Sequence, residues 1–344
     1  MPVQESLPLS VIICTYNRAY LLKQVLESLI KQTLPQSEYE IVLIDDGSSD
    51  NTKEIAEPFR SCLPMKYFYQ RNAGLASAKN HGIFAAQGRV LLFLDDDNIT
   101  MPSLLKEHVE SHCEYPQDNY GVLHYTTWES GLMVTPLMHF VTDEGCFLFN
   151  YPNIKHGDIL DFTYFWGGRS SCKRTFLLEH GVFNPIFRYG CEDIELGYRL
   201  SKYDLRVVYN SGGESKMIRP VGFDDFCQRL IKQGRSQYVF STLHNDRVVY
   251  EWAEIREAEE HWDKIKPIFD AKIRSAAKLD KIAQLQEGHG FGLDKLTRRL
   301  LYQSYWWAFK ACKIKGIMEA KELQQSGYGH KPDNHTREVA GQKT

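Results

Sequence analysis

Short apolar runs and amphipathic segments alternate through the first hundred residues of the chain. Each apolar run is long enough for one buried strand, and the segments between carry apolar residues at helical spacing, as Leu22, Val25 and Leu29 do. The expected strands are residues 9–14, 41–44, 65–69 and 90–94. The expected helices are residues 20–31, a short helix after residue 52, and residues 75–86. Continuous apolar strands separated by helices predict an α/β fold, with a mostly parallel sheet flanked by helices.

The pattern changes after residue 120. Residues 120–245 are irregular and rich in aromatic residues, and three helices are expected beyond them. Those helices are residues 250–266, which Pro267 terminates, 270–287 and 294–320. We divide the chain into a domain at 1–245, with halves at about 8–100 and 101–245, a C-terminal helical extension at 246–322, and a tail at 323–344. The tail is polar and contains glycine and proline, so we expect it to be disordered.

Composition narrows the class of protein. Hydrophobic residues make up 43% of the chain and charged residues 25%, which are ordinary globular values. The net charge of −3 argues against a nucleic-acid partner. The eight cysteines show no paired spacing and are typical of free thiols in a reducing compartment. We find no signal-peptide pattern at the N-terminus and no apolar run of ~20 residues, so we expect a soluble, cytoplasmic protein.

Polar residues follow each of the four predicted strands. They are Thr15, Tyr16, Asn17 and Arg18 after the first, Asp45 and Asp46 after the second, Arg71 and Asn72 after the third, and Asp95, Asp96 and Asp97 after the fourth. Ligands of parallel sheets bind at the carboxyl ends of the strands, so these side chains should converge on one crevice. The first strand is followed by neither a Gly-x-Gly-x-x-Gly pattern nor a Walker loop, which disfavours a dinucleotide-binding or P-loop protein.

The acidic turn at residues 95–97 has two interpretations. Asp95 and Asp97 lie two residues apart and project to the same side of extended backbone, which suits an oxygen-preferring divalent cation. Alternatively, the turn is a solvated acidic turn with Asn98 as a cap.

Two further acidic pairs have similar alternatives. Asp45 and Asp46 follow a buried strand, where they either cap the following helix or include one carboxylate that accepts hydrogen bonds from a nucleobase. Glu192 and Asp193 open a predicted helix, where they are either favourable end charges or include the general base of a displacement reaction.

Five ordered motifs together resemble the family 2 glycosyltransferases of the GT-A fold. They are Ser10–Arg18 (SVIICTYNR), Val42–Thr52 (VLIDDGSSDNT), Arg71–Gly82 (RNAGLASAKNHG), Leu94–Asp97 (LDDD) and Glu192–Leu196 (EDIEL). The resemblance covers residues 8–245. It implies a nucleotide-binding half at 8–100, an acceptor-binding half at 101–245, and inverting transfer of a sugar from a nucleoside diphosphate.

The resemblance also implies roles for matching residues. Asp193, with Glu192 beside it, is the catalytic base position, and Asp97 with Asp95 reaches a Mn²⁺ or Mg²⁺ ion. The implied donor-binding residues are Cys14, Thr15, Asn17, Arg18, Asp46, Arg71, Lys79, Asp96, Gly167, Gly168 and Arg235. Trp166 and Arg169 flank the two glycines and are implied to contact the acceptor.

This chain departs from the family pattern at three places. Lys79 stands where an arginine is usual, Arg169 stands where an asparagine is frequent, and no histidine occurs between Asp193 and His244 to serve as a third metal ligand. The implied partners are a nucleotide sugar, best matched by UDP because Asp46 resembles a uracil contact, and a glycan or lipid-linked acceptor in polysaccharide biosynthesis. Alternatives are transfer to a polyprenyl phosphate, a non-catalytic sugar-binding module of the same fold, and a nucleotidyltransferase, which the missing phosphate loop disfavours.

Two other segments each have a functional and a structural interpretation. His108 and His112 lie four residues apart on an amphipathic helix, which is metal-capable spacing, but we expect them to face solvent. Residues 297–318 interleave aromatic and basic residues. They either place the protein at the inner face of a membrane or pack against the catalytic domain or a second copy in a homodimer, and we favour packing.

Overall fold

The computed structural model describes residues 7–326 and begins with a parallel sheet. Its strands are β1 (Leu9–Thr15), β2 (Tyr39–Asp45), β3 (Met65–Tyr69) and β4 (Val90–Asp95). The helices between them are α1 (Ala19–Leu29), α2 (Thr52–Ala56) and α3 (Leu75–Ala85). Each predicted strand and helix of this region is confirmed within a few residues. The register aligns Cys14 with Asp95 and Thr15 with Asp45, so the polar ends of neighbouring strands lie side by side.

The second half of the sheet is mixed. Its elements are β5 (Asn98–Thr100), α4 (Leu104–Glu114), β6 (Tyr120–Trp128), α5 (Pro136–His139), β7 (Ile159–Leu160), β8 (Ser170–Lys173), α6 (Arg174–His180), α7 (Glu192–Ser201) and β9 (Arg206–Met217). The strand order is β3-β2-β1-β4-β8-β6-β9-β5, and β7 pairs with β9. Strands β4 and β8 are antiparallel whereas β6 and β9 are parallel, so the sheet predicted to be mostly parallel is parallel from β1 to β4 and mixed beyond.

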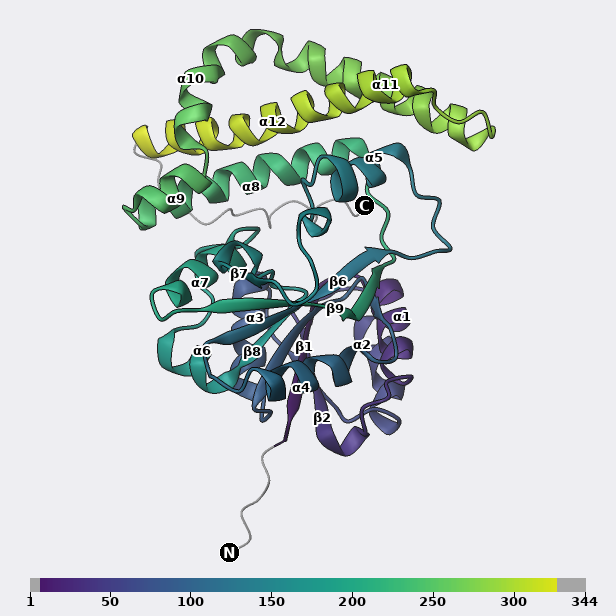
Figure 1. Cartoon of the computed structure of the whole chain (residues 1–344), viewed down its shortest axis with the longest axis vertical. Coiled ribbons are helices and arrows are strands. Elements are labelled where there is room, and N and C mark those ends of the chain that lie inside the picture. Colours follow the sequence, from purple (N-terminus) through teal and green to yellow (C-terminus); the bar gives the residue numbers. More distant parts are fainter. Residues whose placement is uncertain (1–6, 327–344) are drawn as a thin grey trace, which may run out of the picture.

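Helices form a separate layer above the carboxyl ends of the parallel strands (Figure 1). They are α8 (Phe223–Leu243), α9 (Arg247–Trp252), α10 (Ile255–Ile265), α11 (Phe269–Gly288) and α12 (Lys295–Gln325). The predicted helix at 250–266 is wrong as one element, because the chain breaks at Glu254, whose φ of 57° lies in the left-handed region. Glu254 instead forms ion pairs with Lys310 and Lys313 of α12.

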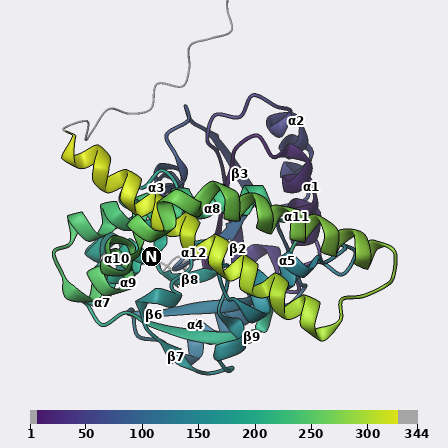
Figure 2. The same ribbon diagram turned by 90° about the horizontal axis from the view of Figure 1, so that it is seen from above.

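Helix α12 crosses closely over α8 (Figure 2). A Cβ atom at Gly316 would lie 2.0 Å from the carbonyl oxygen of Ile231, and one at Gly234 would lie 2.2 Å from that of Lys313. Only glycine at both positions lets the two backbones approach this closely. Tyr305 and Phe309 of α12 are fully buried beneath, so the aromatic residues of 297–318 pack largely within the molecule, as favoured from the sequence.

The disorder predicted for residues 323–344 is wrong for the first three of them, because α12 continues through residues 323–325. Residues 327–344 of that predicted tail lie outside the described residues. The division at residue 245 stays a prediction.

Candidate functional site

A cavity of about 360 Å³ lies where β1 and β4 end, beneath α8. The acidic turn after β4, the first residues of α7 and the segment Trp166–Arg169 all line it. These three regions are far apart in the sequence. The fold therefore brings together two of the acidic groups that the sequence singled out, Asp95 with Asp97 and Glu192 with Asp193.

Every carboxylate of the acidic turn is paired with an arginine. Arg169 donates to Asp95 over 2.9 Å, Arg219 donates to Asp97 over 2.8 Å, and Arg18 donates to Asp96 over 2.8 Å. Burial opposes ionisation of Asp95, but the neighbouring positive charges, Arg169 first and then Lys79, Arg18 and Arg229, together outweigh it and hold the pKa of Asp95 below its usual value. Burial raises the pKa of Asp96 to about 6, against the opposing effect of Arg18.

Asp95 and Asp97 have donor chemistry that fits a divalent cation. Mg²⁺ and similar ions are held by one or two carboxylates together with waters and substrate phosphates, so two aspartates suffice. Within residues 7–326 no cluster of three or more histidine, cysteine, aspartate or glutamate side chains is placed to hold a metal. Because Arg169 and Arg219 already pair with Asp95 and Asp97, a cation at this turn would compete with these arginines for the two carboxylates.

Asp193 lies at the first turn of α7 and faces the cavity. The backbone N–H of Gly167 donates to one carboxylate oxygen over 2.9 Å, and the N–H of Ile194 donates to the other over 2.8 Å. Burial and the neighbouring Glu192 charge raise the pKa of Asp193 to about 6. A carboxylate with a pKa near neutrality is well matched to accepting a proton.

Glu192 has a different environment. Its carboxylate accepts a hydrogen bond from the Lys79 ammonium over 3.0 Å, and both side chains are almost fully buried. Burial opposes the charge on Lys79, but Glu192 and Asp193 outweigh it and raise the pKa of Lys79. Glu192 is thus neutralised by a fixed partner, which leaves Asp193 as the better candidate for a base.

The two glycines after Trp166 are required by close contacts. A Cβ atom at Gly168 would lie 2.2 Å from the carboxylate of Asp95, and one at Gly167 would lie 2.6 Å from the Lys79 ammonium. The segment Trp166–Arg169 is therefore in close contact with Asp95 and with Asp193. Arg169, which follows, is buried and has its Nε atom without a partner among the described residues.

Of the predicted donor-binding residues, Arg18, Lys79, Gly167 and Gly168 line this cavity, whereas Asp46, Asn17 and Arg71 do not. Asp46 accepts hydrogen bonds from the N–H groups of Ala73 and Gly74 and from Gln70, so it anchors the loop after β3. Asn17 accepts from the N–H of Ser49, and Arg71 is exposed.

Two further predicted donor-binding residues, Cys14 and Thr15, lie at the end of β1 and do not line the cavity either. Burial raises the pKa of the Cys14 thiol well above its usual value, so it stays neutral. The buried hydroxyl of Thr15 finds no partner within residues 7–326.

Arg235 is also outside the cavity, because it pairs with Glu319 of α12 over 2.7 Å. Two arginines that the sequence analysis missed line the cavity instead, Arg219 after β9 and Arg229 on α8. Arg229 lies six residues before Arg235 on the same helix, so the basic residues of that helix could have indicated it as a phosphate-binding candidate. The sequence around Arg219 indicates no such role, apart from its position after a strand.

The expectation that His108 and His112 face solvent is wrong. Both are buried, and they share Ser171 as a hydrogen-bond partner at 2.8 Å. His108 also contacts His124 over 3.0 Å, and His124 contacts Ser215 over 3.0 Å. Burial lowers the pKa of His108 to about 3, so this chain of hydrogen bonds across the sheet is uncharged at neutral pH.

His244, the first histidine after Asp193, contacts Glu195 over 2.9 Å, and Glu195 is also paired with Arg199 as its helical spacing predicts. His244 does not line the cavity, so the structure supplies no third metal ligand from it. Among the described residues, none of the helices is long and apolar enough to span a membrane.

Comparison with known proteins gives a consistent result. Residues 10–176 match the family model described as Glycosyl transferase family 2. Validoxylamine A glucosyltransferase of Streptomyces hygroscopicus subsp. jinggangensis is 30% identical over 224 residues, which are 58% of this chain and 53% of that protein. The chain spans about half the length of this relative and of its counterpart from Streptomyces hygroscopicus subsp. limoneus.

Two solved structures share the fold. The crystal structure of S. aureus TarS 1–349 has a TM-score of 0.52 at 18% identity, covering 93% of this chain and 92% of that one. Mannosyltransferase PcManGT from Pyrobaculum calidifontis, in complex with GDP-Man and Mn²⁺, has a TM-score of 0.57 at 17% identity, covering 90% and 87%. At such identities the likeness shows the fold alone, and it confirms the predicted GT-A type α/β class with a helical C-terminal region.

Proposed function

We propose that this protein is an inverting glycosyltransferase, since residues 10–176 match the family model described as Glycosyl transferase family 2. It moves a sugar from a nucleoside-diphosphate donor to a hydroxyl group of a glycan or lipid-linked acceptor. The observation that carries the proposal is that one cavity holds both Asp193, with its raised pKa, and the acidic turn at Asp95 and Asp97. A single displacement needs both a base for the acceptor and a group that stabilises the departing diphosphate.

Asp193 is the proposed base. It removes the proton of the attacking hydroxyl, which adds to the face of the anomeric carbon opposite the diphosphate, so that one displacement inverts the configuration. The N–H groups of Gly167 and Ile194 orient its carboxylate. General base catalysis of this kind typically contributes ~10²–10⁴-fold to the rate.

Asp95 and Asp97 are the residues proposed to hold Mn²⁺ or Mg²⁺. When bound, such an ion supplies Lewis-acid stabilisation of the negative charge on the leaving diphosphate. The fold relative PcManGT was solved with Mn²⁺ and GDP-Man, which supports this assignment. Arg18, Arg219 and Arg229 line the same cavity and are proposed to bind phosphate oxygens through charge-assisted hydrogen bonds.

UDP is the proposed nucleotide, with Asp46 as its base contact. S. aureus TarS 1–349 has been solved in complex with UDP-GlcNAc, which supports a uridine donor on this fold. A carboxylate offers about four acceptor positions, and Asp46 uses three of them on the loop after β3. One position therefore remains for a base N–H.

Nucleotide-dependent thermal stability tests the donor site. We would measure the melting temperature with UDP, GDP, dTDP and CDP, with and without Mn²⁺, for the natural protein and for Asp97→Asn. Ligand at 100 times its Kd adds ~2.7 kcal/mol of stability, enough to shift the melting temperature by several degrees. We expect a Mn²⁺-dependent shift with UDP that Asp97→Asn abolishes. No shift with any nucleotide would reject the donor site and favour a non-catalytic module.

Replacement of Asp193 by Asn tests the reaction. If the acceptor is a hydroxyl group, UDP binding persists while turnover falls by at least ~10²-fold. If the acceptor is a polyprenyl phosphate, it is already ionised, and Asp193→Asn retains activity. Arg229→Gln and Arg235→Gln form a matched pair on α8, and only the first should weaken UDP binding.

A further inference from the structure

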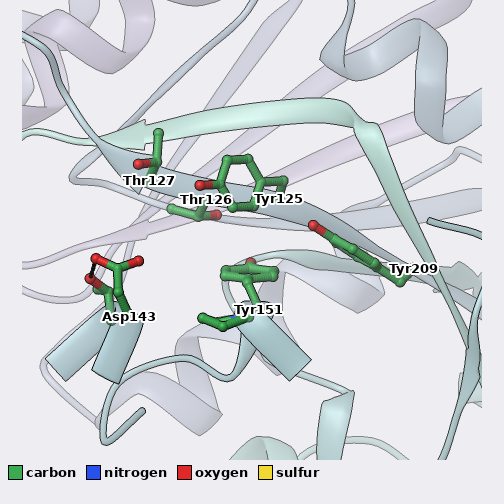
Figure 3. A pocket seen from close by; sticks show the side chains of 8 residues that line it. Tyr125, Thr126, Thr127, Asp143, Tyr151 and Tyr209 are labelled. Atoms are coloured by element: carbon green, nitrogen blue, oxygen red, sulfur yellow. Dashed lines mark hydrogen bonds between the residues drawn. The ribbon is translucent and has the colours of Figure 1, made fainter. Parts of the chain in front are cut away.

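A second cavity, of about 180 Å³, lies between β6, β9 and the loop that follows α5 (Figure 3). Its walls include Tyr125, Thr126, Thr127, Asp143, Tyr151 and Tyr209. It shares no lining residue with the catalytic cavity. Because none of these residues was assigned a role in sugar transfer, the cavity is a separate feature of the molecule.

The Tyr209 hydroxyl opens into this cavity although the residue is largely buried. The residue is only 5% exposed, its hydroxyl forms no hydrogen bond with any described residue, and it is not among the polar atoms that are shut off from solvent. Figure 3 shows the hydroxyl directed toward the space between Tyr125 and Tyr151. The hydroxyl is therefore available to a ligand or to water in the cavity.

Of the other hydroxyl groups that line the cavity, some form hydrogen bonds within the protein and others do not. Tyr151 donates to the backbone oxygen of His124 over 2.8 Å, and Thr126 contacts Ser215 over 2.9 Å, so both are held in place by the protein. The hydroxyls of Tyr125 and Thr127, by contrast, form no hydrogen bond with any described residue. Together with Tyr209, they give the cavity three uncommitted hydroxyl groups.

The three tyrosine rings supply an aromatic lining around those hydroxyls. The Tyr151 ring lies 5.1 Å from that of Tyr125, edge to face, and 5.7 Å from that of Tyr209. No lysine or arginine lines the cavity, and its single charge is the half-exposed carboxylate of Asp143. An anionic ligand such as a phosphate is disfavoured here, whereas a neutral molecule with many hydroxyl groups and a partly apolar face is complementary.

We propose that this cavity is a saccharide-binding site, separate from the catalytic cavity, that takes one neutral sugar ring. The sugar hydroxyls pair with Tyr209, Tyr125 and Thr127, its apolar face packs on a tyrosine ring, and Asp143 accepts a hydroxyl at the mouth. Tyr151 forms the wall toward the catalytic side, because its ring contacts Trp166 at 5.2 Å and Trp166 lines the catalytic cavity. The site needs no transfer reaction to bind its ligand, so it stands independently of the proposed function.

Ligand-observed NMR on the full chain tests the site. Saturation-transfer spectra would be recorded with glucose, galactose, mannose and N-acetylglucosamine, with inorganic phosphate as a separate anion competitor. The variants are Tyr209→Phe, which keeps the ring and removes the hydroxyl, Thr127→Val, and the control Tyr203→Phe at an exposed tyrosine. Arg229→Gln, at a residue that lines the catalytic cavity, serves as the control for binding there.

We expect at least one sugar to bind, and Tyr209→Phe and Thr127→Val each to weaken it by about five- to tenfold, the effect of one lost hydrogen bond. Tyr203→Phe, Arg229→Gln and phosphate should leave that binding unchanged. The proposal is overturned if no sugar binds, which would mean that water alone fills the cavity. It is equally overturned if sugar binding is lost in Arg229→Gln and retained in Tyr209→Phe, because the signal would then come from the catalytic cavity.

Discussion

Gly168 lies directly against Asp95, so that a Cβ atom at residue 168 would be 2.2 Å from the atoms of the Asp95 carboxylate. The two residues are 73 positions apart in the sequence, and β8, which begins two residues after Gly168, pairs with β4. The absence of a side chain at residue 168 therefore determines where the carboxylate at the end of β4 can lie. This contact links the segment Trp166–Arg169 to the acidic turn.

Gly168→Ala should displace Asp95 and break its ion pair with Arg169. We expect Mn²⁺-dependent UDP binding to weaken by at least about tenfold, corresponding to ~1.4 kcal/mol. Isothermal titration calorimetry measures the change. Gly288→Ala is the matched control, because a Cβ there meets no atom within 4 Å. Unchanged binding in Gly168→Ala would show that the Asp95 position is unimportant for the donor.

Activity should depend on the ionisation of Asp193. Its pKa is raised to about 6 and a base must be deprotonated, so kcat/KM should fall by up to tenfold per pH unit below about pH 6. Glu192→Gln removes a neighbouring negative charge and should move this acidic limb to lower pH. A pH profile of both proteins, with Glu179→Gln as a remote control, measures it. A limb that stays in place in Glu192→Gln would contradict the assigned cause.

The buried pair of Lys79 and Glu192 should be sensitive to loss of one partner. Lys79→Met leaves a buried carboxylate without its cation, which typically costs ~3–5 kcal/mol of stability. The double variant Lys79→Met/Glu192→Gln should recover most of that loss, because no buried charge remains. Urea unfolding of the two variants tests this, and Arg60→Gln at an exposed pair should change stability by less than ~1 kcal/mol.

The free energy of unfolding should fall at acid pH because of the buried, hydrogen-bonded histidines of α4 and β6. The folded-state pKa of His108 is about 3, below its unfolded value of ~6.5. The unfolded chain therefore binds the proton first, and stability falls by up to ~1.4 kcal/mol per pH unit as the pH drops from 6.5 toward 3. His108→Gln should show a smaller slope in urea unfolding between pH 7 and 5. An equal reduction in the control His261→Gln would refute this cause.

The contact of α8 with α12 should depend on Gly316. Gly316→Ala places a Cβ 2.0 Å from the carbonyl oxygen of Ile231, and overpacking of this kind typically costs ~1–3 kcal/mol. Differential scanning calorimetry should show a lower melting temperature. Gly288→Ala, near the end of α11, is the control and should leave it unchanged or slightly higher. An unaffected Gly316→Ala would mean that the helices can separate at no cost.

Local pattern was sufficient for the first half of the fold. The apolar runs of β1 to β4 and the polar residues after them predicted a parallel sheet and a crevice at its carboxyl ends. Strand and helix periodicity is a property of neighbouring residues, so it can be read along the chain. For the same reason the acidic turn at Asp95–Asp97 and the helix start at Glu192 were recognisable as candidate chemistry.

The tertiary structure decided the contacts between residues that are far apart in the sequence. The pairing of Asp97 with Arg219, the burial of His108 against Ser171 and the displacement of Arg235 onto Glu319 depend on strand order and helix packing. An amphipathic helix shows which residues share a face, but polar residues can be buried on that face when a distant partner satisfies them. The left-handed turn at Glu254 likewise followed from lysines on α12, some sixty residues later. Sequence therefore determined the elements and their candidate groups, and only packing decided which charges meet.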